Sequence, residues 1–173
     1  MRLARWAANQ ALTPTPGDIL PYLKHVFTTV GMAKVAGSAF EGIELGFLPA
    51  RTQVNLNGDR RLYAAKQEVL CLAHLGYVPP ARDPIPVLGA PARAVLEHMA
   101  FVMEAGHYAS PFDRSLANRL AYVITGGDLD GPTTVDDDYL LRLEREHFLP
   151  LIDEPKTKDR ILHMLKTKKP LRN

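Results

Sequence analysis

Cysteine is almost absent from this chain of 173 residues, which contains only Cys71. A single cysteine cannot form a disulfide bond within the chain. It stands between Leu70 and Leu72, where we expect it to behave as a small apolar side chain. The lack of disulfides indicates a protein of a reducing compartment, and we predict a cytoplasmic location.

Excess charge and long apolar runs are also missing. The formal net charge is only +2, which predicts no general attraction to nucleic acid or to anionic membranes. No stretch of about 18 consecutive apolar residues is present, so we expect no membrane span. The first residues also lack the apolar run of a signal peptide.

The composition that remains is that of a globular helical protein, with 46% hydrophobic and 23% charged residues. Apolar residues recur at helical spacing, and no turn pair separates alternating runs, so we predict an all-α fold of about seven helices with little or no sheet. Start signals lie at Asp18, Ser38, Asp59, Pro91, Ser110 and Asp136, and stop signals lie at Gly31, Gly46, Gly76, Gly106 and Gly126. A helix is also expected over residues 1–11, and a last one after Pro150 and Pro155.

The helix from Ser38 to Gly46 has the most complete start and stop signals. Ser38 and Glu41 have the spacing of a capping box, in which the hydroxyl accepts from one free amide and the carboxylate accepts from another. Gly46 is expected to end the helix, followed by the apolar contact of Phe47–Leu48. This is a structural device, and by itself it indicates no reaction.

Prolines mark the predicted domain boundary. Five of the fourteen residues from 78 to 91 are proline, which disfavours both a helix and a strand ladder. We therefore predict three parts: helices in residues 1–77, a proline-rich linker at 78–91, and a C-terminal helical subdomain at 92–173.

No complete catalytic constellation or metal site is visible in the sequence. The six histidines include no pair at the i, i+4 spacing that places two imidazoles on one metal ion. Gly126–Gly131 lacks the ending of a phosphate loop and the glutamate of a calcium loop, so a helix-terminating turn is expected. Ser38 lacks the second glycine of a nucleophile elbow and is expected to act as a cap.

The C-terminal eighteen residues are strongly basic, and Asp159 is the only acidic residue among them. Such a segment is able to hold a phosphate-rich ligand, although a solvated basic terminus is the competing interpretation. Nucleic acid is a third and weaker alternative for this segment. The cations are Lys156, Lys158, Arg160, Lys166, Lys168, Lys169 and Arg172.

Several segments resemble known enzymes of fatty-acid β-oxidation. Residues 32–48, MAKVAGSAFEGIELGFL, resemble the helix that follows the catalytic core in the crotonase (enoyl-CoA hydratase) superfamily. Residues 120–129, 139–148 and 154–173 resemble the C-terminus of long bacterial proteins. Those proteins carry a 3-hydroxyacyl-CoA dehydrogenase domain first and an enoyl-CoA hydratase domain after it.

The resemblance implies a helical region that covers the active site and packs between subunits, commonly in trimers. In the family, the catalytic glutamates, the oxyanion-hole amides and the nicotinamide-binding glycine loop all lie upstream of the matched segments. It therefore implies no catalytic residue and no cofactor in this chain, whereas the parent enzyme would use NAD and coenzyme A thioesters. Lys168 and Lys169 are the residues that the resemblance places near the phosphates of coenzyme A.

The main hypothesis is a C-terminal helical fragment of such an enzyme, which lacks the catalytic core and is inactive alone. Its expected partners are the missing crotonase core, a coenzyme A thioester, or a second copy bound through apolar helix faces. For the helix from Ser38 to Gly46, we expect a substitute partner or an exposed apolar patch. The alternative is a stand-alone helical interaction module with no coenzyme A chemistry.

Overall fold

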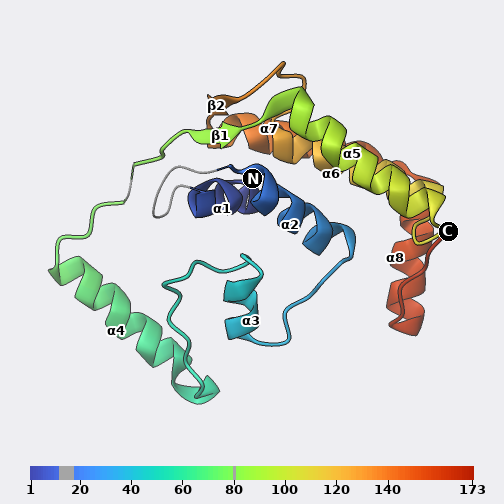
Figure 1. Ribbon diagram of the computed structural model, residues 1–173. Helices are drawn as coiled ribbons and strands as arrows, with labels where there is room; N and C mark the ends of the chain where they lie inside the picture. Colours follow the sequence, from blue (N-terminus) through green and yellow to red (C-terminus); the bar gives the residue numbers. More distant parts are fainter. Residues whose placement is uncertain (12–17, 80) are drawn as a thin grey trace. The chain divides into compact units, whose positions relative to one another are not determined.

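The computed structural model describes residues 1–11, 18–79 and 81–173. Over these residues it contains eight α-helices, one short 3₁₀ helix and one two-stranded sheet (Figure 1), so the predicted all-α class with little sheet is confirmed. The elements are α1 (Arg2–Ala11), α2 (Leu20–Gly31), α3 (Ala39–Glu44), η1 (Gly58–Arg60), α4 (Arg61–His74), β1 (Ile85–Val87), α5 (Gly89–Ala105), α6 (Pro111–Thr125), β2 (Thr133–Val135), α7 (Asp137–Asp153) and α8 (Pro155–Thr167).

The chain divides into two compact units. Met1–Lys34 and Pro84–Asn173 form the main unit, and Val35–Asp83 forms the second unit. One dividing point, Asp83/Pro84, falls within the proline-rich segment 78–91, of which Pro80 lies outside the described residues. The other, after Lys34, had no signal in the sequence, and the three-part division 1–77, 78–91 and 92–173 stays a prediction.

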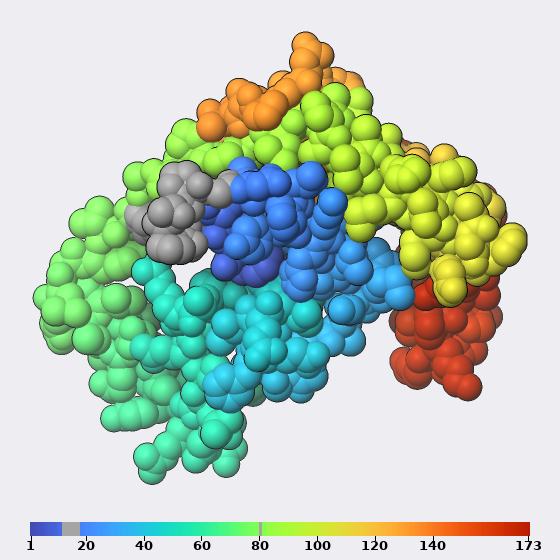
Figure 2. Space-filling view, viewed as in Figure 1, coloured from blue at the N-terminus to red at the C-terminus, as the bar shows by residue number. Residues whose placement is uncertain are grey.

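The main unit is built on α1, α2, α5, α6 and α7, and it buries two apolar clusters. Leu23, Val26, Phe27, Leu96 and Ile124 belong to the first cluster, which joins α2, α5 and α6. In Figure 2, the blue atoms of α2 lie against the yellow-green atoms of α5. The buried face of α1 carries alanines, and their short side chains let this helix pack against both clusters.

The second cluster lies where α1 meets β1 and α7. Ala4 and Ala8 of α1 pack there with Ile85, Val87 and Leu140. Ile85 and Val87 are each 1% exposed. Because they alternate with Pro86, both point to the same buried face, and β1 pairs antiparallel with β2 in the register Ile85↔Val135.

This strand lies in a segment that the sequence predicted to be a linker. In a two-stranded sheet both strands are edge strands, so a proline is tolerated where it would break a central strand. The prolines around β1 suggested a loop, because Pro86 has no N–H to donate to a strand ladder. The free energy gained by burying Ile85 and Val87 outweighs the loss of that hydrogen bond. The segment therefore contributes to the core.

Most helix ends of the main unit follow the predicted signals. The Ser110 hydroxyl accepts from the Asp113 amide, and the Asp113 carboxylate accepts from the Ser110 amide, which completes a capping box at the start of α6. Gly126 ends this helix with φ +97°. The last helix, α8, begins at Pro155 as expected, and α7 continues through Pro150 to Asp153.

In the second unit, the predicted cap of α3 is present with one difference. The Ser38 hydroxyl accepts from the Glu41 amide at 3.1 Å. The Glu41 carboxylate accepts from the amide of Gly37 at 2.6 Å, one residue before the expected partner Ser38. Gly46 has φ +79°, and the Leu48 side chain covers Gly42, as expected for a glycine-terminated helix with an apolar contact after it.

The apolar face of α4 is exposed in the structure. Leu62 is 81% exposed and Val69 is 64% exposed, and α4 has no buried residue. Cys71, which was expected to behave as a small apolar side chain, is also exposed. In α3, Phe40 is 59% exposed, which fits the expected exposed patch.

Candidate functional site

The predicted ligand-binding lysines lie at the end of α8. Lys168 has φ +59°, and its amide donates to the Met164 carbonyl at 2.9 Å, which ends the helix. The Lys169 amide donates to the Thr167 hydroxyl at 3.2 Å. Both side chains are exposed, and neither ammonium group has a carboxylate partner among the described residues. The structure therefore places both charges in solvent beside the negative end of the α8 dipole.

Arg160 of α8 takes a different role from these lysines. Its guanidinium contacts Asp113 at 2.7 Å and donates through Nε to the Asn173 side-chain oxygen at 2.8 Å. The same group lies 4.8 Å from the centre of the Phe112 ring. Arg160 thus ties α8 and the C-terminal residues to the first turn of α6, and only part of the basic segment is free to bind a ligand.

Asp113 is the centre of this contact. Burial would raise the pKa of its carboxyl, but three interactions act in the opposite direction. The Ser110 amide, the Arg160 guanidinium and the Ser110 hydroxyl all stabilise the carboxylate, so the pKa of Asp113 lies below its usual range. The ionised form is therefore the one that the folded protein favours.

An apolar cavity opens next to this ion pair, inside the main unit. Its volume is about 470 Å³, and its walls come from the end of α2, from α5 and α6, and from Pro170–Arg172. Met103 and Leu120 line the apolar part, and the side chains of Arg114, Arg160 and Arg172 also border it. Lys168 and Lys169 do not line this cavity, so the structure separates the predicted lysines from the hollow nearest to them in sequence.

A second and more open hollow lies between α5, α6 and α7, with a volume of about 480 Å³. Tyr122 and His147 lie in its wall with their ring centres 4.3 Å apart. Asn118 Oδ1 and His147 Nδ1 are buried there without a hydrogen-bond partner among the described residues. This lining is polar and charged, in contrast to the apolar cavity.

Asp128 joins α5 to α6 beside the second hollow. Arg93 donates to one carboxylate oxygen at 2.9 Å, and the Tyr122 hydroxyl donates to the other at 2.7 Å. The Arg93 hydrogen bond, followed by that of Tyr122, lowers the pKa of Asp128. The bond to Asp128, followed by burial, raises the pKa of the Tyr122 hydroxyl.

The sequence indicated the turn at Gly126–Gly131 but not this cluster. Gly126 and Gly127 both have positive φ, so the helix-terminating turn is confirmed. Arg93 and Asp128 are 35 residues apart, and no spacing rule connects them. Across the described part of the chain, no group of three or more His, Cys, Asp or Glu side chains is placed to hold a metal ion.

No described helix is both long and apolar enough to cross a membrane. The chain is predominantly helical. Its main unit has a packed core, and the apolar side chains of its second unit are largely exposed to solvent. No family model matches this chain, and no solved structure matches it.

A curated protein does match. Over 147 residues the chain is 43% identical to a protein of Bacillus subtilis (strain 168) described as "Probable 3-hydroxyacyl-CoA dehydrogenase". The alignment covers 85% of this chain and 19% of that relative, so the chain spans about a fifth of the length of the protein it matches. The chain is thus homologous to part of this probable 3-hydroxyacyl-CoA dehydrogenase, and the dehydrogenase side of the predicted resemblance is confirmed.

Proposed function

We propose that this chain is the helical segment of a fatty-acid β-oxidation enzyme that hydrates enoyl-CoA and oxidises 3-hydroxyacyl-CoA with NAD. The observation that carries this proposal is the 43% identity to a probable 3-hydroxyacyl-CoA dehydrogenase. The enoyl-CoA hydratase (crotonase) part rests on the resemblance of residues 32–48 to the helix that follows a crotonase core. The chemistry belongs to domains outside the matched segment, and the enzyme acts in the cytoplasm.

In this proposal, the second unit supplies a surface for the catalytic core. Leu62, Val69 and Leu75 of the α4 region are 81%, 64% and 77% exposed. Burying a large apolar side chain stabilises a complex by about 1.5 to 3 kcal/mol, so a partner that covers this face gains considerably. A second copy of the chain is the competing occupant.

Lys168 and Lys169 are proposed to approach the phosphates of coenzyme A. Their ammonium groups are exposed and free of carboxylate partners among the described residues, so binding a phosphate breaks no ion pair. Arg160 is not proposed for this role, because it is held by Asp113 and Asn173.

The test supplies the core and the segment as separate chains. The Bacillus subtilis relative is truncated to remove the part homologous to this chain, and hydratase turnover of crotonyl-CoA is measured with and without the purified 173-residue chain. We expect no turnover by the chain alone and restored turnover by the mixture. Turnover by the chain alone, or no rescue in the mixture, would contradict the proposal.

Matched variants assign the two surfaces. Leu62→Asp on α4 is expected to abolish the rescue, whereas the exposed Lys66→Gln on the same helix leaves it unchanged. Lys168→Gln/Lys169→Gln should raise the KM for crotonyl-CoA about fivefold at an unchanged kcat, since exposed ion pairs contribute about 1 kcal/mol at most. Lys34→Gln/Lys66→Gln removes the same charge elsewhere and is the control.

A stand-alone helical interaction module is the second candidate function. The exposed α4 face favours it as much as it favours a segment that binds a core. The same mixing experiment separates the two, because an unrelated module does not restore hydratase turnover.

A further inference from the structure

The cavity between α2, α5, α6 and Pro170–Arg172 has the size and lining of a small-molecule site. Its volume of about 470 Å³ lies within the usual range for ligand pockets, which are mostly apolar with a few placed polar groups. All its walls belong to the main unit, whose core is packed. The cavity therefore belongs to the unit that has the packed core.

The apolar walls of this cavity suit a flexible hydrocarbon chain. Phe27 and Ala100 from the first core cluster form part of the lining, and three methionines, Met32, Met99 and Met103, line it from two sides. Methionine side chains are flexible and polarisable, so they adapt to apolar ligands of varying shape. A linear chain is therefore able to fit against this lining.

Three arginines border the cavity, and two of them are paired with carboxylates. Arg114 pairs with Glu104 at 2.8 Å, and Arg160 pairs with Asp113 at 2.7 Å. Arg172 donates to the main-chain oxygen of Tyr108 at 3.0 Å and has no carboxylate partner among the described residues. A guanidinium carries five N–H donors in a planar fork, so Arg172 keeps donors that suit a carboxylate.

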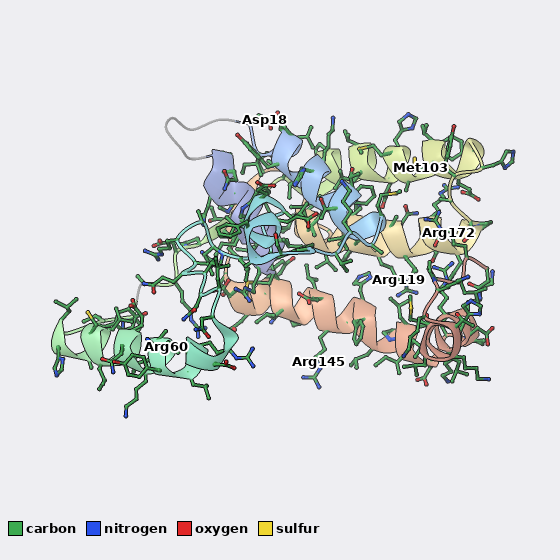
Figure 3. The ribbon with its side chains drawn as sticks, turned by 90° about the horizontal axis from the view of Figure 1, so that it is seen from below. Asp18, Arg60, Met103, Arg119, Arg145 and Arg172 are labelled. Carbon is green, nitrogen blue, oxygen red and sulfur yellow. The ribbon has the colours of Figure 1, made fainter. Side chains whose placement is uncertain are left out.

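We propose that this cavity binds a linear apolar chain that ends in a single carboxylate, of the chemical class of a medium-chain fatty acid. The chain lies against Met99 and Met103, and the carboxylate is bound by Arg172. Figure 3 shows Met103 and Arg172 at the same end of α5 and α6, whereas Arg145 projects from α7 on another side. The inference goes beyond the proposed function, since it requires neither coenzyme A nor a catalytic core.

The methionines supply the binding test and its internal control. The full chain is labelled with ¹³C at the methionine methyl groups and titrated with decanoate below its micelle concentration. Met32, Met99 and Met103 line the cavity, and Met1 and Met164 do not. We expect the first three signals to shift and the other two to stay in place. No shift at all, or equal shifts of all five, would overturn the proposal.

The charge of the ligand is tested with decan-1-ol and decyltrimethylammonium. We expect decanoate to bind about tenfold more tightly than the alcohol, which corresponds to about 1.4 kcal/mol for a charge-assisted hydrogen bond. The ammonium compound should bind most weakly. Equal binding of acid and alcohol would contradict the carboxylate assignment and would indicate a purely apolar occupant, such as part of another protein.

Two variants separate the carboxylate contact from the chain contact. Arg172→Gln should reduce decanoate affinity to that of the alcohol, while the exposed Arg145→Gln leaves it unchanged. Met103→Trp places a larger side chain at a position that is already 36% exposed, and it should weaken acid and alcohol alike. Decanoate binding that survives both Arg172→Gln and Met103→Trp would overturn the proposal. The outcome does not depend on the core-mixing experiment, because only this chain is present.

Discussion

The two units of this protein have helices with similar capping signals, but they differ strongly in how many apolar side chains they bury. In the main unit, Leu23, Leu96 and Leu140 are at most 2% exposed, and two apolar clusters are closed. In the second unit, Val35–Asp83, no large apolar side chain among the described residues is buried. Both units nevertheless begin a helix with a serine cap and an acidic residue three positions later.

The difference shows that helix signals and core formation are separate properties. Caps and glycine stops stabilise helix ends locally, with about 1 kcal/mol per cap. Most helix stability in proteins comes instead from packing an amphipathic face. The α4 helix has such a face without a surface to pack against among the described residues, which is the physical reason to expect a partner there.

The largest expected effect contrasts a leucine from each unit. Leu96→Ala removes a side chain that is 0% exposed and should lower the free energy of unfolding by about 3 kcal/mol. Leu62 on α4 is 81% exposed, so Leu62→Ala should change the free energy of unfolding by less than about 0.5 kcal/mol. Urea unfolding followed by the fluorescence of Trp6, which packs against the first cluster, measures both. Equal effects would show that the second unit is packed in solution.

The next contrast uses two glycines with the same backbone but different surroundings. Gly89 has φ +66°, and an added Cβ would lie 2.5 Å from the Leu129 carbonyl oxygen. Gly76 has φ +68° and nothing within 4 Å of that position. We expect Gly89→Ala to cost about 3 kcal/mol, from the left-handed backbone and a forced shift, and Gly76→Ala about 1 kcal/mol from the backbone alone. Thermal unfolding followed by circular dichroism measures the two losses, and equal losses would contradict the close approach at Gly89.

The smallest expected effect is pH-dependent and concerns the cap of α6. The folded pKa of Asp113 lies below its reference value of 3.8, so ionised Asp113 stabilises the fold above the unfolded pKa. This stabilisation is lost as the pH falls through the folded pKa, because both states are then protonated. Near neutral pH, Asp113→Asn should therefore cost about 1 to 2 kcal/mol, and the difference from the wild type should shrink as the pH falls through the folded pKa.

The control for this series is Asp130→Asn, which removes an exposed carboxylate from the loop after α6. Urea unfolding at several pH values should show a near-constant difference for this variant. A constant difference for Asp113→Asn as well would mean that the Arg160 and Ser110 contacts do not favour the charged form. Among the described residues, the serine cap of α3 has no such partner from a distant helix. The pH series therefore compares a cap supported by a distant arginine with a purely local cap.

The candidate sites could be predicted only in part. The basic C-terminal segment is visible in the sequence, and so are Lys168 and Lys169, whose ligand role stays a prediction. The sequence grouped Arg160 with them, but its contact with Asp113 across 47 residues makes it a structural residue. Asp128 and its partner Arg93 gave no signal, because neither lies within a helical repeat of the other.

Local signals in the sequence were sufficient to predict the helical class and most helix ends. A cap such as Ser110 or a stop such as Gly126 acts on amides and carbonyls within a few residues, so local spacing is sufficient. Tertiary contacts determine which apolar faces are buried and where β1 pairs with β2. They also determine which of the three arginines at the cavity border has no carboxylate partner among the described residues. Those outcomes depend on contacts between distant segments, and no local pattern distinguishes the buried Leu96 from the exposed Leu62.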